Sequence, residues 1–146
     1  MLQIISDLET KMSNFWQDFK GPVFSLAPME DVTDTVFREI VMDTATPGNL
    51  NVVFTEFTSV EGMNHPVGRT RVSDRLIVSN SERELLKKLN IKLVAQIWGR
   101  NPEIYHNIAK YITENYEFDG LDINMGCPVK KVFKISVWTN IGIYIL

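Results

Sequence analysis

The order of apolar and polar positions predicts short strands that alternate with amphipathic helices. Residues 2–19 repeat large apolar side chains at helical spacing, which predicts an N-terminal amphipathic helix within residues 1–20. Gly21 and Pro22 end it. We expect this helix to pack against the rest of the chain, since that is far commoner than binding a membrane or a partner.

Four apolar runs predict strands. They cover residues 22–28, 51–57, 91–99 and 118–126. The first run ends at Pro28 and the third at Gly99, while the second is rich in β-branched and aromatic residues. Runs of this length bounded by glycine or proline are typical of buried strands.

A first helix is expected between two of these strands, over residues 33–42. Thr33 or Asp34 is placed to cap it. One face of this helix carries the side chains expected to pack on the sheet, namely Val36, Phe37, Ile40 and Val41. Residues 58–80, which include His65 and Pro66, are polar and predict an irregular loop.

Two further helices have clear end signals. Ser81 and Glu84 have the spacing of a capping box, and Asn90 can close that helix. The next helix begins with Asn101 as cap and Pro102 in the first turn, a favoured position for proline. Its inner face is formed by Ile104, Ile108 and Ile112.

Strands that alternate with helices predict an α/β fold with a parallel sheet. In such sheets, ligands bind at the carboxyl ends of the strands. Polar or sterically special residues lie at the carboxyl ends of all four predicted strands: Ala27, Pro28, Met29, Glu30, Glu56, Phe57, Gln96, Asn124, Met125, Gly126 and Cys127. This convergence on one edge of the sheet is the strongest functional signal that the residue pattern gives.

Composition narrows the class of protein. The 146 residues are 45% hydrophobic and 23% charged, with a net charge of -3, which is typical of a soluble globular domain. That charge argues against nucleic-acid binding through a general basic field. No apolar run approaches the roughly 20 residues that span a bilayer, and a single cysteine fits the reducing cytoplasm.

Two carboxamides are candidate binding groups. Gln96 and Asn124 each offer donors and an acceptor. They could form hydrogen bonds with the edge of a flat heterocycle, or with backbone groups of the loops. Met29 could pack on a planar ring or fill the core. Gly126 could admit a ligand close to the backbone or simply form a turn.

Cys127 is the only cysteine in the chain. It could be a nucleophile, a metal ligand, a proton donor or a buried apolar group. No other cysteine is present, and His65 and His106 lack ligand spacing, so we expect no metal site. His106 lies at a surface position of its helix. Lys130 and Lys131 could meet phosphate, although loop lysines are usually solvated.

Four segments in this order resemble the tRNA-dihydrouridine synthases, which are FMN-dependent enzymes with a (β/α)8 barrel followed by a helical domain. They read LAPMEDVTD at 26–34, TEF at 55–57, VAQIWG at 94–99 and LDINMGCPVKKV at 121–132. The last is close to diagnostic. The resemblance covers residues 21–132 and implies a partial TIM barrel of about four βα units.

The resemblance also implies roles for individual residues. Pro28, Met29 and Glu30 match the first flavin-contacting loop. Gln96 matches a glutamine that contacts the flavin ring, and Asn124 an asparagine that contacts both the flavin and the target base.

In the implied reaction, NADPH or NADH reduces FMN, and the flavin delivers hydride to C6 of a uridine flipped out of tRNA. Cys127 matches the catalytic proton donor and would protonate C5. This reading predicts a cytoplasmic protein with tRNA as its partner, without a membrane or a metal.

The sequence departs from the family in two places. Asp31 stands where a glycine often precedes the valine of the first turn. Residues 133–146 form an apolar tail where the family continues with a glycine-rich loop. A complete barrel needs about 250 residues, and its phosphate site lies after strands 7 and 8. We therefore expect a truncated chain that binds FMN weakly or not at all, and is inactive alone.

Two alternatives remain at this stage. One is another FMN barrel that acts on free pyrimidines, of the dihydropyrimidine or dihydroorotate type. The other is a non-catalytic truncated product.

Overall fold

The structure is a computed structural model that describes residues 14–125. The predicted helix over residues 1–20 lies largely outside this range, as do Gly126, Cys127, Lys130, Lys131 and the apolar tail. The described part begins with a 3-10 helix, η1 (Phe15–Asp18), whose first turn is capped by the side chain of Asn14.

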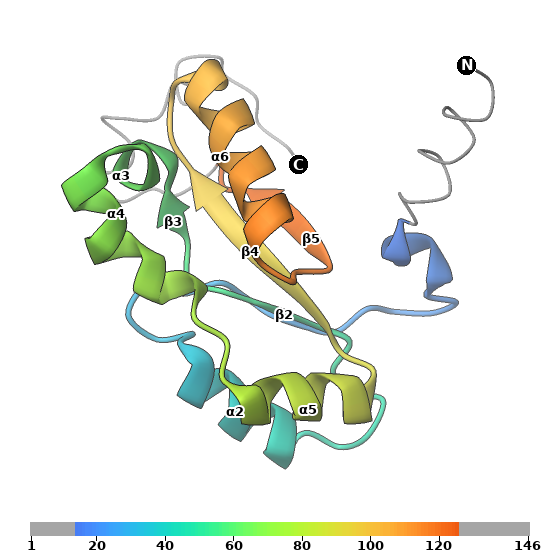
Figure 1. The fold of residues 1–146 in the computed structure, drawn as a ribbon. Coiled ribbons are helices and arrows are strands. Elements are labelled where there is room, and N and C mark those ends of the chain that lie inside the picture. The colour runs from blue at the N-terminus through green and yellow to red at the C-terminus, as the bar shows by residue number, and fades with distance from the viewer. Residues whose placement is uncertain (1–13, 126–146) are drawn as a thin grey trace.

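The sheet is parallel throughout the described residues, which confirms the predicted α/β class. In Figure 1, β4 runs through the centre of the sheet, and it pairs with β2, β3 and β5, while β1 pairs with β2. The strands are β1 (Ser25–Leu26), β2 (Val52–Phe54), β3 (Thr58–Ser59), β4 (Lys92–Trp98) and β5 (Gly120–Ile123).

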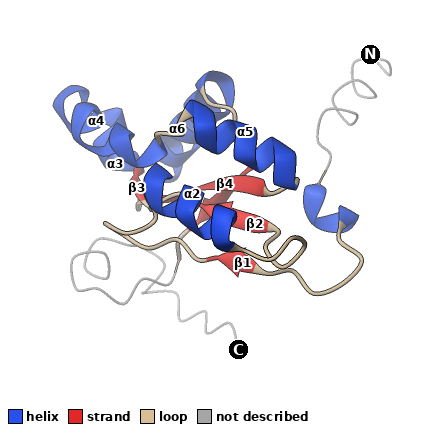
Figure 2. Cartoon of the chain, turned by 90° about the horizontal axis from the view of Figure 1, so that it is seen from below, coloured by secondary structure: helices blue, strands red, loops and turns tan. Residues whose placement is uncertain are grey.

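Apart from η1, the helices lie on one face of this sheet, as the view from below shows (Figure 2). They are α2 (Thr35–Thr44), α3 (Val60–Asn64), α4 (Pro66–Val72), η2 (Ser73–Leu76), α5 (Asn80–Leu89) and α6 (Pro102–Asn115). One-sided cover of parallel strands is the arrangement of a barrel wall, in which helices form the outer layer.

Several predicted helix ends are confirmed. Asp34 caps α2 by accepting a hydrogen bond from the backbone N–H of Phe37. Asn90 closes α5 in the left-handed conformation, with φ of 54°. Asn101 caps α6. The start of α5 was predicted two residues late, because Ser79 is the cap and accepts from the N–H of Glu82.

The prediction of an irregular loop over residues 58–80 was wrong. This stretch contains β3, α3, α4 and η2. Its helices are too short to show a clear apolar period, and their caps are local: Ser59 caps α3, and the Nδ1 atom of His65 accepts from the N–H of Gly68 at the start of α4. His65 therefore caps a helix, and it is exposed.

The predicted inner face of the first helix was wrong at two of its four positions, since Phe37 and Val41 are half-buried. Val36 and Ile40 are 59% and 57% exposed, whereas Arg38 and Met42 are the buried residues of α2. Met42 packs with Leu86 of α5. The side of α2 that meets α5 carries an arginine, which the apolar pattern assigns to solvent.

Side chains alternate between two faces along each strand. On the helix-covered face, Ala95 and Ile97 of β4 pack in one cluster with Ile108 and Ile112 of α6, as predicted for the inner face of that helix. On the opposite face, Val52 and Val94 pack with Phe15 of η1. By the same alternation, Gln96 lies on the face of Val94.

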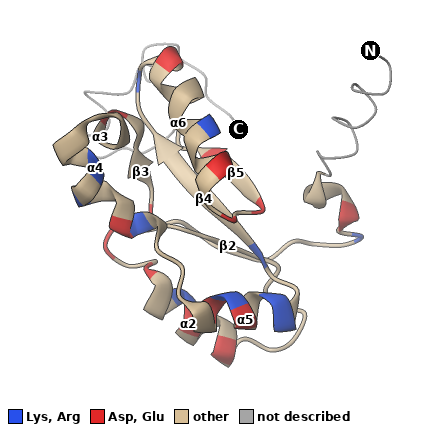
Figure 3. Ribbon diagram, in the orientation of Figure 1, with Lys and Arg blue, Asp and Glu red and all other residues tan. Residues whose placement is uncertain are grey.

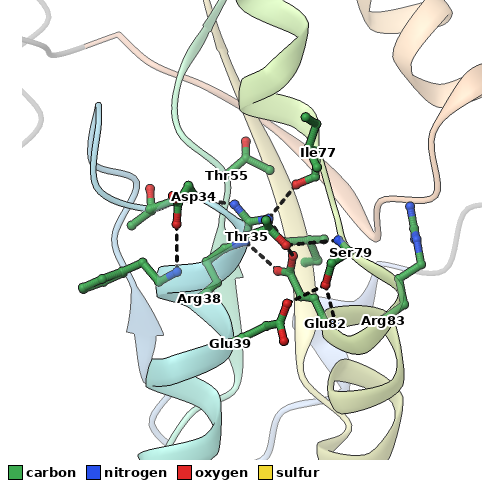
Figure 4. A network of polar contacts seen from close by, with 12 residues as sticks. Asp34, Thr35, Arg38, Glu39, Thr55, Ile77, Ser79, Glu82 and Arg83 are labelled. Atoms are coloured by element: carbon green, nitrogen blue, oxygen red, sulfur yellow. Dashed lines mark hydrogen bonds and ion pairs between the residues drawn. The ribbon is translucent and has the colours of Figure 1, made fainter.

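A buried ion pair joins α2 to α5 (Figure 4). Both side chains, Arg38 and Glu82, have 0% relative exposure. The Nε and Nη2 atoms of Arg38 donate to the two carboxylate oxygens of Glu82 at 2.6 and 2.8 Å. Arg38 also donates to the carbonyl oxygens of Thr33 and Ile77 at 2.6 and 2.9 Å, so the pair fixes the segments that lead into both helices.

Charged residues of both signs are interspersed along the helices, and α5 in particular carries both (Figure 3). Among the described residues, no helix is long and apolar enough to cross a membrane.

Candidate functional site

A β-bulge separates β2 from β3. Phe54 pairs with Val94, and Thr58 pairs with Ile97, so three residues on one strand face two on the other. The extra residue separates β2 from β3, and only β2 lies within the predicted strand over residues 51–57. Bulges often lie beside functional sites, where they redirect a side chain. Here the bulged segment is Thr55, Glu56 and Phe57, all buried.

The bulge connects two neighbouring strand ends. The Glu56 carboxylate accepts a hydrogen bond from the backbone N–H of Asp31 at 2.5 Å, in the loop after β1. The Thr55 hydroxyl accepts from the N–H of Gln96 at 3.2 Å, in β4. These bonds hold the carboxyl ends of three strands in fixed relation, which a shared binding edge requires.

The loop after β1 is closed by its own residues. The hydroxyl of Thr33, which is fully buried, lies 3.0 Å from both the N–H and the carbonyl oxygen of Met29. Asp31 has φ of 58°, in the left-handed region that glycine enters freely and Asp or Asn tolerate. The departure from the family's glycine therefore keeps the turn, with aspartate taking the left-handed position.

Arg75 of η2 ties this loop to the bulge. Its Nη2 atom donates to the Glu30 carboxylate at 2.8 Å, and its Nη1 atom donates to the carbonyl oxygen of Phe57 at 3.1 Å. The side chains of Arg75 and Glu30 are 24% and 36% exposed. The guanidinium thus sets the position of a residue predicted to lie in a flavin-contacting loop.

Three polar side chains form a hydrogen-bonded row at the carboxyl ends of β4 and β5. Nε2 of Gln96 donates to the Asp122 carboxylate at 2.5 Å, and Nδ2 of Asn124 donates to Oε1 of Gln96 at 3.0 Å. Gln96 is 7% exposed. The structure therefore brings together the two carboxamides that the sequence singled out separately.

The predicted residues in the described range fall into two groups. Pro28, Met29 and Glu30 lie in the loop after β1, with Met29 37% exposed. Gln96 and Asn124 form the pair at the ends of β4 and β5. The bulge links the groups through Thr55 and Glu56. Cys127 and Gly126 lie outside the described residues.

The match to known proteins decides the family. The family described as "Dihydrouridine synthase (Dus)" matches residues 25–137. The chain belongs to the dihydrouridine synthase family. This confirms the resemblance stated from the motifs. With a parallel sheet and one-sided helices, it identifies the described residues as part of a TIM-barrel-type dihydrouridine synthase domain.

Curated relatives support the same assignment. The chain is 44% identical over 119 residues to "Probable tRNA-dihydrouridine synthase 2" of Bacillus subtilis (strain 168), covering 82% of this chain and 33% of the relative. It is 44% identical over 121 residues to "Probable tRNA-dihydrouridine synthase" of Staphylococcus aureus (strain COL), covering 83% and 33%. The chain thus spans about a third of the length of these relatives. No solved structure gives a significant match.

The polar groups present fit the flavin that the dihydrouridine synthase family uses. Two carboxamides that each donate and accept suit the ring edge of a flavin, which has both kinds of group. Within residues 14–125, no group of three or more His, Cys, Asp and Glu could hold a metal ion. The chemistry of Gln96 and Asn124 fits such a ring edge, and the two side chains meet at the carboxyl ends of β4 and β5.

Sequence reasoning missed two residues of this candidate site. Asp122 precedes Asn124 by two positions, so strand alternation could have placed both on one face. Arg75 lies in the stretch predicted as an irregular loop, and it has no spacing signal. Glu56 was noted at a strand end, but its bond to the loop after β1 depends on the bulge.

Proposed function

We propose that the protein containing this segment reduces uridine in tRNA to dihydrouridine with FMN as its flavin. The observation that supports this function most directly is the Gln96–Asn124 pair at the ends of β4 and β5, in a chain of the dihydrouridine synthase family. The tRNA-dihydrouridine synthase names of its relatives support tRNA as the substrate.

The loop after β1 and the carboxamide pair would hold the flavin. Pro28, Met29 and Glu30 form one wall, and the partly exposed Met29 offers a soft side chain to a planar ring. Gln96 and Asn124 bind the polar edge of the ring, and Asn124 also contacts the target base. The buried Thr33 and the ion pair of Glu30 with Arg75 keep the first wall in place.

Cys127 acts as the proton donor. An unperturbed thiol has a pKa near 8.5 and is mostly protonated at neutral pH, as a general acid must be. When bound, FMN supplies the hydride for C6 of uridine, and NADPH or NADH restores it. Cys127 supplies the proton for C5.

The substrate is a uridine that has left the base stack, because neither face of a stacked base is open to a side chain. Since the chain spans about a third of its relatives, tRNA contacts are assigned mainly to the remainder of the longer protein. We place the reaction in the cytoplasm, where tRNA is modified with reduced nicotinamide cofactors.

The test uses a hybrid in which residues 25–132 of this chain replace the matching segment of the Bacillus subtilis relative. The hybrid is produced in cells that lack their own dihydrouridine synthases, and dihydrouridine in tRNA is measured by mass spectrometry. We expect dihydrouridine to return, and the purified hybrid to carry FMN. A flavin-loaded hybrid that reduces free uracil but leaves tRNA unmodified would contradict the proposed substrate.

The matched variant Cys127→Ala tests the proton donor. We expect it to retain FMN, seen as the flavin absorbance of the purified protein, and to lose tRNA reduction. Normal turnover in this variant would remove the assignment. The 146-residue chain alone should purify without stoichiometric flavin, because barrels of this type bind the phosphate after strands 7 and 8. A yellow preparation would show that the short chain already holds the cofactor.

A further inference from the structure

We propose that Asp122 is a positioning residue that fixes which way the carboxamides of Gln96 and Asn124 face, and so makes the pair specific for the flavin ring. The proposal rests on the proposed function, because it concerns the same flavin site. Asp122 was not among the residues that the sequence indicated for the site, and the structure gives it a contact with Gln96.

The backbone places Asp122 beside Gln96. The two are directly paired in the parallel ladder between β4 and β5, so their side chains leave the same face of the sheet. The Asp122 carboxylate accepts from Nε2 of Gln96 at 2.5 Å. This face is the one opposite the helices, which in a barrel points to the packed interior, and both residues lie toward the carboxyl ends of their strands, where such barrels bind ligands.

The carboxylate determines the orientation of both carboxamides. An ionised carboxylate can only accept hydrogen bonds, so the NH₂ group of Gln96 must face it. The Gln96 carbonyl oxygen then faces Asn124, and Nδ2 of Asn124 donates to it at 3.0 Å. Asp122 therefore sets the orientation of the Gln96 carboxamide, and Gln96 in turn sets that of Asn124.

Loss of the carboxylate removes this preference. The oxygen and nitrogen of a carboxamide have nearly the same size, so a 180° flip has little steric resistance, and hydrogen bonding decides the orientation. A flip of Gln96 would turn its NH₂ group toward Nδ2 of Asn124, placing two donors face to face. The pair would then present a mixture of donor and acceptor patterns, and only part of the population would match the flavin edge.

The same contact could instead serve only to hold β4 and β5 together. The two roles differ in what they change. A purely structural bond affects unfolding, while its loss leaves the affinity of the folded protein for FMN and the spectrum of the bound flavin unchanged. An orienting bond changes the hydrogen bonds at the flavin edge, and therefore both FMN affinity and the position of the flavin absorption bands.

The experiment compares Asp122→Leu and Asp122→Asn in the hybrid that carries residues 25–132. Flavin-free protein is titrated with FMN by fluorescence quenching, and the bound spectrum is recorded. We expect Asp122→Leu to raise the Kd about tenfold, the lower end of what a hydrogen bond to a charged group contributes, and to shift the flavin bands. Asp122→Asn keeps an acceptor of the same shape but can flip itself, so its Kd should lie between those of the parent and Asp122→Leu.

The matched control is Asp119→Asn, just before β5. Asp119 also bonds across to the β4 side, accepting from the N–H of Leu93 at 2.9 Å and from Nζ of Lys92 at 3.1 Å, but it lies at the amino end of the strand. We expect this variant to lose stability and to keep the parent Kd and flavin spectrum.

Each outcome decides the proposal. A Kd and a spectrum in Asp122→Leu equal to those of the parent would overturn the orienting role and leave the proposed function standing. An equal rise in Kd for Asp119→Asn would show a general effect of strand stability, which also overturns it. If Asp122→Leu does not fold, the isosteric Asp122→Asn decides alone. A parent hybrid that folds but binds no FMN would overturn the proposed function as well.

Discussion

The buried pair of Arg38 and Glu82 gives the sharpest prediction about stability. Both side chains have 0% exposure, and two charge-assisted hydrogen bonds of 2.6 and 2.8 Å join them. Glu82→Gln keeps the shape but removes the negative charge, so the guanidinium stays buried without its counter-charge. Thr35, whose hydroxyl donates to Glu82 at 2.6 Å, keeps an acceptor only in one orientation of the new amide.

The size of the effect follows from these contacts. A hydrogen bond between charged groups contributes about 1.5–3 kcal/mol, and removing one partner of a buried pair costs about 3–5 kcal/mol. The carbonyl oxygens of Thr33 and Ile77 still accept from Arg38 in the variant, so we expect the lower end, about 3 kcal/mol. With a urea slope of about 1.5–2 kcal/mol per molar, the unfolding midpoint falls by roughly 1.5–2 M.

The assay is urea unfolding of the 146-residue chain, followed by circular dichroism at the helix band. Glu84→Gln is the control, because Glu84 lies on the same helix and is exposed. Its free energy of unfolding should change by less than about 0.5 kcal/mol. If the free energy of unfolding of Glu82→Gln lies within about 1 kcal/mol of that of the parent, the guanidinium must regain solvent or another partner. The argument from burial is then refuted.

Three further predictions concern the loop after β1 and the end of β4. Asp31→Val forces a β-branched side chain into φ of 58° and should cost about 1–2 kcal/mol, whereas Asp31→Gly should leave the urea midpoint unchanged or raised; equal losses in both would argue against the left-handed turn. Arg75→Met removes the bonds to Glu30 and to the backbone of Phe57, and in the hybrid it should weaken FMN binding more than it lowers stability, since the ion pair is partly solvated and contributes about 1 kcal/mol or less. An unchanged Kd for FMN would show that Glu30 is held by other contacts. Gly99→Ala places a methyl carbon 2.4 Å from Cγ2 of Val60 and 2.7 Å from Oε2 of Glu61, which should lower stability by about 1–3 kcal/mol. Gly21→Ala is the control, because a methyl group there meets nothing within 4 Å. An unchanged urea midpoint in Gly99→Ala would mean that α3 can shift.

Much of the fold could be predicted because its signals are local. Asn101 and Pro102 mark the start of α6, and Asn90 marks the end of α5, through interactions within a few residues. The parallel sheet follows from alternation of strands and helices. The carboxamides Gln96 and Asn124 were expected at one edge because both lie toward the carboxyl ends of predicted strands, and their contact bears out this placement.

The missed features depend on distant residues. Arg38 is buried only because Glu82 lies opposite, 44 positions away, and the apolar pattern of one helix contains no trace of that partner. It therefore favoured Val36 and Ile40, which are exposed. The bulge at Glu56 is visible only when the registers of two strands are compared. Contacts of this kind are set by tertiary packing, which overrides local pattern.

The strand order has a consequence for how the domain forms during synthesis. Paired residues lie close in sequence: Leu26 pairs with Val53, Val53 with Leu93 and Val94 with Gly120. β2, β4 and β5 therefore each find a partner strand that has already been made, and closing each loop has a modest entropic cost. A sheet of this order can be assembled stepwise as the ribosome releases the chain, which leaves circular closure of a longer relative as the last event.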